Sequence, residues 1–210
     1  MHPIPLELAK LFKAASVDSI SYQPSSRHLP NENESFRLAA VAIVIYRELG
    51  ILKTILTLRS AYNGHHSGQV SFPGGKFDDT DNDLIQTARR ECYEEIGIDF
   101  RKGIHIGKLE SLYIPVSGFL IEPHLFYYET LPELNKNERE VAELIPFELS
   151  ELIKTEIKSL RDIIHRERTI KNTPVFHISG HEVWGATAIL LEDLRRILLV
   201  LLESESSKTE

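Results

Sequence analysis

Glu91, Glu94 and Glu95 lie within five residues of one another and constrain the fold of this chain more than any other feature. The apolar residues around them recur at every fourth position, which predicts a helix over 83–96. At helical spacings of three and four residues, the three carboxylates share one face within a single turn. The chain must therefore place a cluster of like charges on one side of a helix.

Such a cluster has two interpretations. Most charge runs are solvated surface, and that interpretation stays open here. However, like charges at this spacing repel one another, and their position near the helix C-terminus is opposed by the helix dipole. Both effects favour a compensating cation, and carboxylate oxygens suit hard divalent ions such as Mg²⁺, which also pairs with phosphate groups.

A glycine pair, Gly74-Gly75, follows Pro73 and precedes this helix. A Gly-Gly turn after proline lets the backbone approach a ligand or an ion closely. The pair belongs to a glycine- and aspartate-rich stretch over 60–83, which predicts a long loop, and long loops in compact domains are usually functional. Its position one loop before a helix that carries carboxylates makes the glycine pair more informative.

The other predicted elements mix strands and helices. We expect strands over 37–46, 51–59, 103–112, 119–129 and 173–178, helices over 5–15 and 187–202, and a mixed loop-and-helix segment over 138–151 that Pro146 interrupts. Asp81, Asn82 or Asp83 can cap the start of the acidic helix, and Gly97 suits its end. This order predicts an α/β (α+β) fold such as an α/β/α sandwich.

Composition disfavours several classes of protein. The net charge of −7 argues against binding nucleic acid by bulk electrostatics. The longest apolar runs fall well short of the ~20 residues that span a bilayer. We expect neither a signal peptide nor a lipid anchor. With a single cysteine, Cys92, no intrachain disulfide can form. A cytoplasmic protein with no nucleic-acid or membrane partner is therefore expected.

The segment 75–98 resembles the Nudix box of the Nudix hydrolases, which is a glycine, a loop acid, then Arg-Glu-apolar-x-Glu-Glu-x-Gly-apolar. The matching residues are Gly75, Arg90, Glu91, Glu94, Glu95, Gly97 and Ile98. The interval from Gly75 to Arg90 is one residue longer than usual, and Asp81, Asn82 or Asp83 stands near the place of the usual loop glutamate. The resemblance implies the Nudix α/β/α sandwich with a mixed β-sheet.

The longer box, with Asp78 and Asp81 in its loop, looks like that of the coenzyme A pyrophosphatase subfamily. Two more stretches are similar to this subfamily, over 56–75, which ends in Phe-Pro-Gly-Gly, and over 180–188. One position departs, because Gly64 stands where the subfamily pattern usually has arginine. A phosphate contact at this place is then missing, or is supplied by His65 or His66.

The resemblance implies a centre of Mg²⁺ or Mn²⁺ held by Glu91, Glu94 and Glu95, with the Gly75 carbonyl as an added ligand. It also implies that Arg90 orients a glutamate and does not contact the substrate. The alternative for Arg90 is a surface salt bridge within the helix, which contributes little stability.

A further acid from outside the box is expected, as a metal ligand or general base. We choose Glu140, with Glu138 and Glu143 as alternatives. A solvated helix face explains this glutamate-rich segment about as well. The implied catalytic residues are then Glu94, Glu95, Arg90 and Glu140.

Binding of phosphate groups by an acidic protein needs local cations. Arg59 ends a predicted strand and enters the long loop, where its guanidinium can hold phosphate through two parallel hydrogen bonds. Lys76 and His66, or its neighbour His65, are further candidates for substrate binding. Adjacent histidines are, however, more often surface residues of a loop.

The resemblance implies hydrolysis of the pyrophosphate bond of coenzyme A, or of an acyl or oxidised form, to 3′,5′-ADP and (acyl) 4′-phosphopantetheine. Alternatives are the same reaction on another small-molecule nucleotide, such as ADP-ribose, NADH or a dinucleoside polyphosphate, and a silent nucleotide-binding module. We expect an N-terminal helix and linker over 1–35, a Nudix hydrolase domain over 36–203 that includes the C-terminal helix, and a polar tail over 204–210. A homodimer is considered because many Nudix enzymes form one.

Overall fold

The computed structural model describes residues 30, 35–60, 68–115, 117–154, 160–165 and 168–206 of the chain. The helix predicted over 5–15 and most of the linker that follows it lie outside these residues. Within the described ranges, eight strands form one sheet. Its main order is β3 (Val70–Ser71), β2 (Ile51–Arg59), β1 (Arg37–Glu48), β7 (Phe119–Tyr128) and β5 (Ile104–Lys108). In addition, β4 (Gly74–Lys76) pairs with β1, β6 (Leu112–Ile114) with β7 and β8 (Val141–Glu148) with β2.

Strand β1 (Arg37–Glu48) lies at the centre of this sheet. It pairs in parallel with β7 (Phe119–Tyr128) and antiparallel with β2 (Ile51–Arg59) and β4 (Gly74–Lys76), so the sheet is mixed. Its side chains alternate between two separate hydrophobic clusters. One cluster receives Ala40, Ala42, Val44 and Tyr46, and the other receives Ile43 and Ile45. The sheet is therefore buried on both faces.

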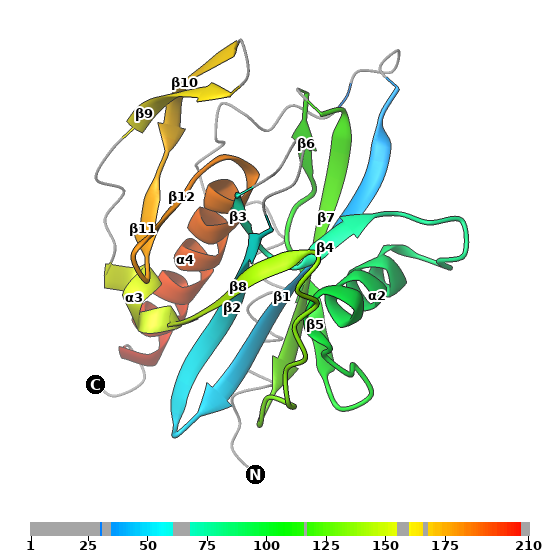
Figure 1. Cartoon of the computed structure of the whole chain (residues 1–210). Helices are drawn as coiled ribbons and strands as arrows, with labels where there is room; N and C mark the ends of the chain where they lie inside the picture. The colour runs from blue at the N-terminus through cyan, green and yellow to red at the C-terminus, as the bar shows by residue number, and fades with distance from the viewer. Residues whose placement is uncertain are drawn as a thin grey trace.

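Helices cover the two faces. Helix α2 (Leu84–Ile96) places Ala88, Cys92 and Ile96 in the cluster that contains the alanines of β1. Helix α4 (Gly185–Ser206) packs into the other cluster through its leucines. Figure 1 shows α2 and α4 on opposite sides of the sheet. The predicted α/β/α sandwich with a mixed sheet is confirmed. Among the described helices, none combines the length and apolar character that crossing a bilayer requires.

The peripheral strands differ in detail from the prediction. Strands β5 (Ile104–Lys108) and β6 (Leu112–Ile114) divide the strand expected over 103–112. Strands β9 (Leu160–His165) and β10 (Arg168–Pro174) form one two-stranded ribbon, and β11 (Phe176–Ile178) and β12 (His181–Val183) form another. The segment over 173–178 is therefore shared between two strands and is not the last strand of the chain.

The prediction for 138–151 was wrong over most of its length. Strand β8 (Val141–Glu148) runs through Pro146, which lies opposite Ile55, and α3 (Leu149–Lys154) follows it. In the described part of the chain β8 pairs with β2 alone, and edge strands tolerate proline, which removes one ladder donor. Strands β3 (Val70–Ser71) and β4 likewise occupy part of the loop expected over 60–83.

Candidate active site

Helix α2 has the bounds and caps that its sequence predicts. The carboxylate of Asp83 accepts a hydrogen bond from the Gln86 backbone N–H at 2.7 Å, so Asp83 is the N-cap among the three candidates. At the other end Gly97 adopts a left-handed backbone conformation with φ of 75°, and its N–H donates to the Tyr93 carbonyl. The helix therefore ends just after the turn that carries Glu94 and Glu95.

The Glu95 carboxylate is almost fully buried, with 2% of its side chain exposed. Arg59 Nη1 donates to its Oε1 at 3.1 Å, and the Gly74 N–H donates to its Oε2 at 3.3 Å. Burial raises the pKa of Glu95 to about 7, and the charges of Glu91 and Glu140 add to this rise, whereas Arg59 and the Gly74 N–H oppose it. Burial and two neighbouring acids therefore both disfavour the charged form of Glu95.

Glu91 faces the glycine pair. A Cβ atom on Gly75 would lie 2.3 Å from Glu91 Cδ, so any other residue at this position would displace the Glu91 carboxylate. Burial raises the pKa of Glu91, although Arg90 Nη1 donates to its Oε1 at 2.8 Å. Glu94 is more accessible, with 49% of its side chain exposed, and lies 3.3 Å from the same nitrogen of Arg90.

Arg90 is held by Asp81. Its Nε and Nη2 donate to the two oxygens of the Asp81 carboxylate, each at 2.9 Å. This carboxylate is buried and also accepts from Thr87 Oγ1 and from the Asp78 N–H. The hydrogen bonds from Arg90 lower the pKa of Asp81 to about 2. Of the three candidates near the place of the loop glutamate, Asp81 is the one that pairs with Arg90.

Glu140 lies in the turn that precedes β8 and not on a helix, so the interpretation of this segment as a solvated helix face was wrong. Its backbone carbonyl accepts from the Ser60 N–H at 2.9 Å, and its Oε1 accepts from Asn137 Nδ2 at 3.2 Å. Its charge acts on both Glu91 and Glu95. Of the alternatives, Glu143 lies 3.3 Å from His181 Nε2, and Glu138 is exposed.

The candidates for substrate binding are placed unequally. The Arg59 guanidinium, on the last residue of β2, is paired with Glu95. Lys76 ends β4 with an exposed side chain, and its backbone carbonyl accepts from Arg90 Nη2 at 3.1 Å. His66, with its neighbours His65 and Gly64, lies outside the described residues.

The donor set fits a hard divalent ion. Carboxylates from α2, the turn before β8 and the close backbone at Gly75 supply oxygen atoms, which Mg²⁺ and Mn²⁺ prefer. As their side chains stand, no three acidic, histidine or cysteine residues of the described ranges converge tightly enough to hold an ion. Glu95 faces Arg59 and Glu91 faces Arg90 in this arrangement, so metal binding requires these side chains to move.

Two contacts of this site had not been predicted from the sequence. The pairing of Arg59 with Glu95 joins residues 36 positions apart, and no local pattern signals it. The Gly74 N–H that donates to Glu95 was signalled only by its place in the Gly-Gly turn.

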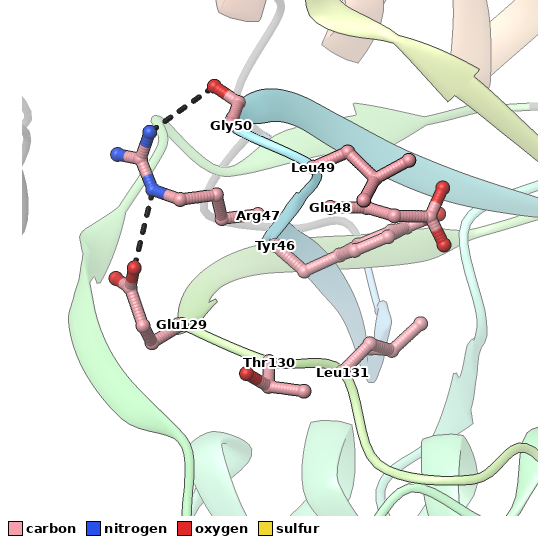
Figure 2. Close-up of a pocket in the computed structure, with 8 residues that line it drawn as sticks. All are labelled: Tyr46, Arg47, Glu48, Leu49, Gly50, Glu129, Thr130 and Leu131. Carbon is pink, nitrogen blue, oxygen red and sulfur yellow. Dashed lines mark hydrogen bonds and ion pairs between the residues drawn. The ribbon is translucent and has the colours of Figure 1, made fainter.

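A pocket of about 300 Å³ lies away from these residues, between the β1–β2 turn and the end of β7. Figure 2 shows Arg47 at its edge, where the guanidinium lies 3.3 Å from Glu129 and donates to the Gly50 carbonyl. None of the acids of α2 lines this pocket. It is therefore separate from the candidate active site.

Comparison with known proteins identifies the family of the chain. The NUDIX domain family matches residues 36–166 of the chain. The mitochondrial coenzyme A diphosphatase NUDT8 of Mus musculus is 34% identical over 163 residues, which cover 76% of this chain and 77% of the mouse protein. The Homo sapiens protein of the same name is 32% identical, covering 76% and 69%. A Nudix hydrolase NudL of Pectobacterium atrosepticum is 35% identical, covering 67% and 72%.

Solved structures show the same fold. A binary complex of the C. elegans Ap4A hydrolase aligns with a TM-score of 0.52 at 18% identity, covering 80% of this chain and 98% of that one. A MutT/nudix family protein from Enterococcus faecalis aligns with a TM-score of 0.50 at 16% identity, covering 82% and 65%. At these identities the likeness concerns the fold alone.

Proposed function

The chain belongs to the Nudix hydrolase family, and we propose that it hydrolyses the pyrophosphate bond of coenzyme A or its derivatives, giving 3′,5′-ADP and (acyl) 4′-phosphopantetheine. The observation that carries this proposal is the similarity to the mouse and human coenzyme A diphosphatases over three quarters of the chain. The upstream segment over 56–75, which resembles that subfamily, supports the same substrate.

The chemistry of a pyrophosphate explains the residues of the site. Its hydrolysis requires neutralisation of a polyanion and activation of a water molecule. A bound divalent ion, Mg²⁺ or Mn²⁺, supplies both. We assign the binding of this ion to Glu91, Glu94, Glu95 and the Gly75 carbonyl. Their oxygen atoms and their mutual repulsion support the assignment.

The remaining residues act on the substrate or on these acids. Arg90, fixed by Asp81, orients Glu91 and Glu94 through its Nη1. Glu140 takes the proton of the attacking water as general base, because it enters the acidic cluster from a separate element. Arg59, Lys76 and His66 bind phosphate oxygens of the substrate.

Partners and compartment follow as proposals. We assign a small-molecule nucleotide as substrate and the cytoplasm as compartment, whereas the two mammalian relatives are named as mitochondrial enzymes. Fluorescence imaging of the natural protein carrying a C-terminal tag distinguishes the two compartments. A homodimer is proposed because many Nudix enzymes form one, and light scattering of the purified chain tests this proposal.

The decisive experiment is mass spectrometry of products after incubation with coenzyme A and Mg²⁺ or Mn²⁺. We expect 3′,5′-ADP and 4′-phosphopantetheine to form, and EDTA to abolish them. Glu94→Gln should lower the rate by orders of magnitude while circular dichroism shows an unchanged fold. Glu133→Gln, which neutralises an exposed glutamate outside the site, is the matched control and should leave the rate unchanged.

A different result separates the alternatives. If coenzyme A stays intact while ADP-ribose, NADH or a dinucleoside polyphosphate is cleaved, the substrate assignment is wrong and the metal assignment stands. If Glu94→Gln cleaves coenzyme A as fast as the unmodified chain, the metal assignment is wrong. If no nucleotide of the panel is cleaved, the silent nucleotide-binding module becomes the favoured interpretation.

A further inference from the structure

The buried carboxylate of Glu95 has an arginine as its cationic partner. Arg59 Nη1 reaches it from the end of β2 at 3.1 Å, and the Gly74 N–H binds its other oxygen at 3.3 Å. Burying a charged carboxylate without such partners is strongly unfavourable. Arg59 therefore supplies the positive charge that this carboxylate requires inside the protein.

The two arginines of the site differ in how firmly they are held. Arg90 makes two hydrogen bonds with Asp81, a buried acid that lies outside the metal-binding set, in addition to its contacts with Glu91 and Glu94. Arg59, in contrast, pairs with no carboxylate other than Glu95 among the described residues. Its buried Nε has no hydrogen-bond partner within the same part of the chain. If Glu95 turns toward a metal ion, Arg59 loses its ion pair and Arg90 keeps one.

The backbone around Arg59 is fixed, so a change of partner needs only the side chain to move. The Arg59 N–H donates to the Gln69 carbonyl, and its own carbonyl accepts from the Gly68 N–H. The next residue, Ser60, donates to the carbonyl of Glu140. The side chain as a whole is 25% exposed, while its backbone is anchored by these hydrogen bonds.

We propose that Arg59 is a resident counter-ion of Glu95 that a divalent cation displaces, so that metal binding frees the Arg59 guanidinium for the phosphates of the substrate. The inference rests on the proposed role of Glu95 as a metal ligand. Arg59 acts through Glu95 before it contacts substrate, and in that step it is a positioning residue. Loading of the metal and capture of the polyanion are coupled as a result, because both use the same side chain.

Calorimetric titration of the full chain with MnCl₂ at pH 8, without any nucleotide, tests this exchange. Because Arg59→Ala removes the competing cation, we expect it to bind Mn²⁺ about tenfold more tightly than the unmodified chain. Arg59→Lys keeps the charge and should bind Mn²⁺ nearly as the unmodified chain does. Thermal unfolding provides a second measurement, since Mn²⁺ should raise the Tm of Arg59→Ala more than that of the unmodified chain.

Arg47→Ala is the matched control. Arg47 is also half-buried and also pairs with one carboxylate, Glu129 at 3.3 Å, but it lies at the separate pocket of Figure 2. Its replacement should leave the Mn²⁺ affinity unchanged. The double variant Arg59→Ala/Glu95→Gln should lose the gain in affinity, because the released ligand is then absent.

Weaker or unchanged Mn²⁺ binding by Arg59→Ala overturns the proposal, and so does the absence of Mn²⁺ binding by the unmodified chain. If Arg59→Ala does not fold, Arg59→Gln, which keeps most of the side-chain volume without its charge, is measured under the same criteria. Since no nucleotide is present, tighter Mn²⁺ binding supports the proposal even if coenzyme A proves not to be the substrate.

Discussion

At the scale of single residues, the Asp81–Arg90 pair links the loop before α2 to the acidic residues of the helix. Asp81 is buried, its two oxygens face the two nitrogens of one guanidinium, and Thr87 and the Asp78 N–H complete its hydrogen bonds. The sequence left three acids or amides open for this place. The folded loop selects Asp81, because its carboxylate pairs with Arg90 whereas Asp83 serves as the N-cap of α2.

Asp81→Asn should destabilise the fold by about 2–4 kcal/mol, because it removes the buried carboxylate that holds Arg90 through two hydrogen bonds and leaves Arg90 only its contacts with Glu91 and Glu94. The rate of coenzyme A hydrolysis should fall as well, since Arg90 no longer holds Glu91 and Glu94. Chemical denaturation and steady-state kinetics measure the two effects. Asp79→Asn, which changes the exposed neighbour in the same loop, should show neither of them.

The same pair predicts a pH dependence of stability. The pKa of Asp81 is lowered from 3.8 to about 2 in the folded chain, so its contribution is fully present above pH 3.8 and is lost as the pH falls toward 2. The difference in unfolding free energy between the unmodified chain and Asp81→Asn should therefore shrink over this interval. A difference that stays constant from pH 5 to pH 2 would show that the Asp81 pKa is not lowered.

Glu140→Gln tests the assignment of the general base. We expect kcat for coenzyme A to fall by ~10²-fold or more, as is typical when a base is removed, while the Tm changes little. Glu143→Gln is the comparison, since Glu143 pairs with His181 on β12. If Glu143→Gln loses the activity and Glu140→Gln keeps it, the two roles must be exchanged.

At the scale of elements, α2 was predictable and β8 was not. Helix α2 is specified locally, by an apolar repeat of four, an N-cap and a left-handed glycine. Strand β8 is specified by its pairing with β2, some ninety residues earlier in the chain, which overrides a glutamate-rich composition and Pro146. The acids of α2 were accordingly placed correctly, whereas the backbone around Glu140 was not.

Gly97→Ala should destabilise the fold by roughly 1–3 kcal/mol, because a left-handed φ of 75° is strained for alanine and its Cβ would lie 2.8 Å from Asn135 Cβ. The last turn of α2, which carries Glu94 and Glu95, should shift with it and lower kcat.

Gly50→Ala provides the control for this change. Gly50 has a similar φ of 83°, but a Cβ there would meet nothing within 4 Å. Gly50→Ala should lower the free energy of unfolding by about 1 kcal/mol, through backbone strain alone, and should keep the kcat of the unmodified chain. Equal losses of activity in both variants would contradict a specific role for the end of α2.

At the scale of the whole molecule, the matched family segment and the folded core have different ends. The NUDIX domain match stops at residue 166, whereas α4 supplies Leu190, Leu191 and Leu194 to the same cluster as Ile43 of β1. We propose that the domain extends to about residue 203, as the sequence indicated. Without α4, the face of the central sheet that carries Ile43 would lose the helix that packs against it.

A chain that ends at residue 166 should not form a packed native state. Each buried leucine contributes roughly 1.5–3 kcal/mol, and the loss of several approaches the whole stability of a domain. Near-UV circular dichroism and solubility compare this truncation with a chain that ends at residue 206, which should fold. A soluble, cooperatively unfolding chain of 166 residues would show that α4 is dispensable.

The site as a whole was predictable only in part. The local motif on α2 identified its acids, but the ion pair between Arg59 and Glu95 arises where β2, β4 and α2 meet. Contacts between distant segments leave no periodic signal in a single sequence. For this reason the sequence predicted Arg59 only as a substrate-binding residue and not as the partner of Glu95.

The parallel pairing of β1 with β7 determines the order in which the nascent chain can fold. Strand β1 ends at Glu48, and β7 begins at Phe119, so roughly seventy residues are added between them. At a typical speed of synthesis this takes roughly 4–14 s. During that interval β1 has an unpaired, apolar edge, the kind of edge on which chains aggregate. Each newly made molecule passes through this exposed state before its central sheet can close.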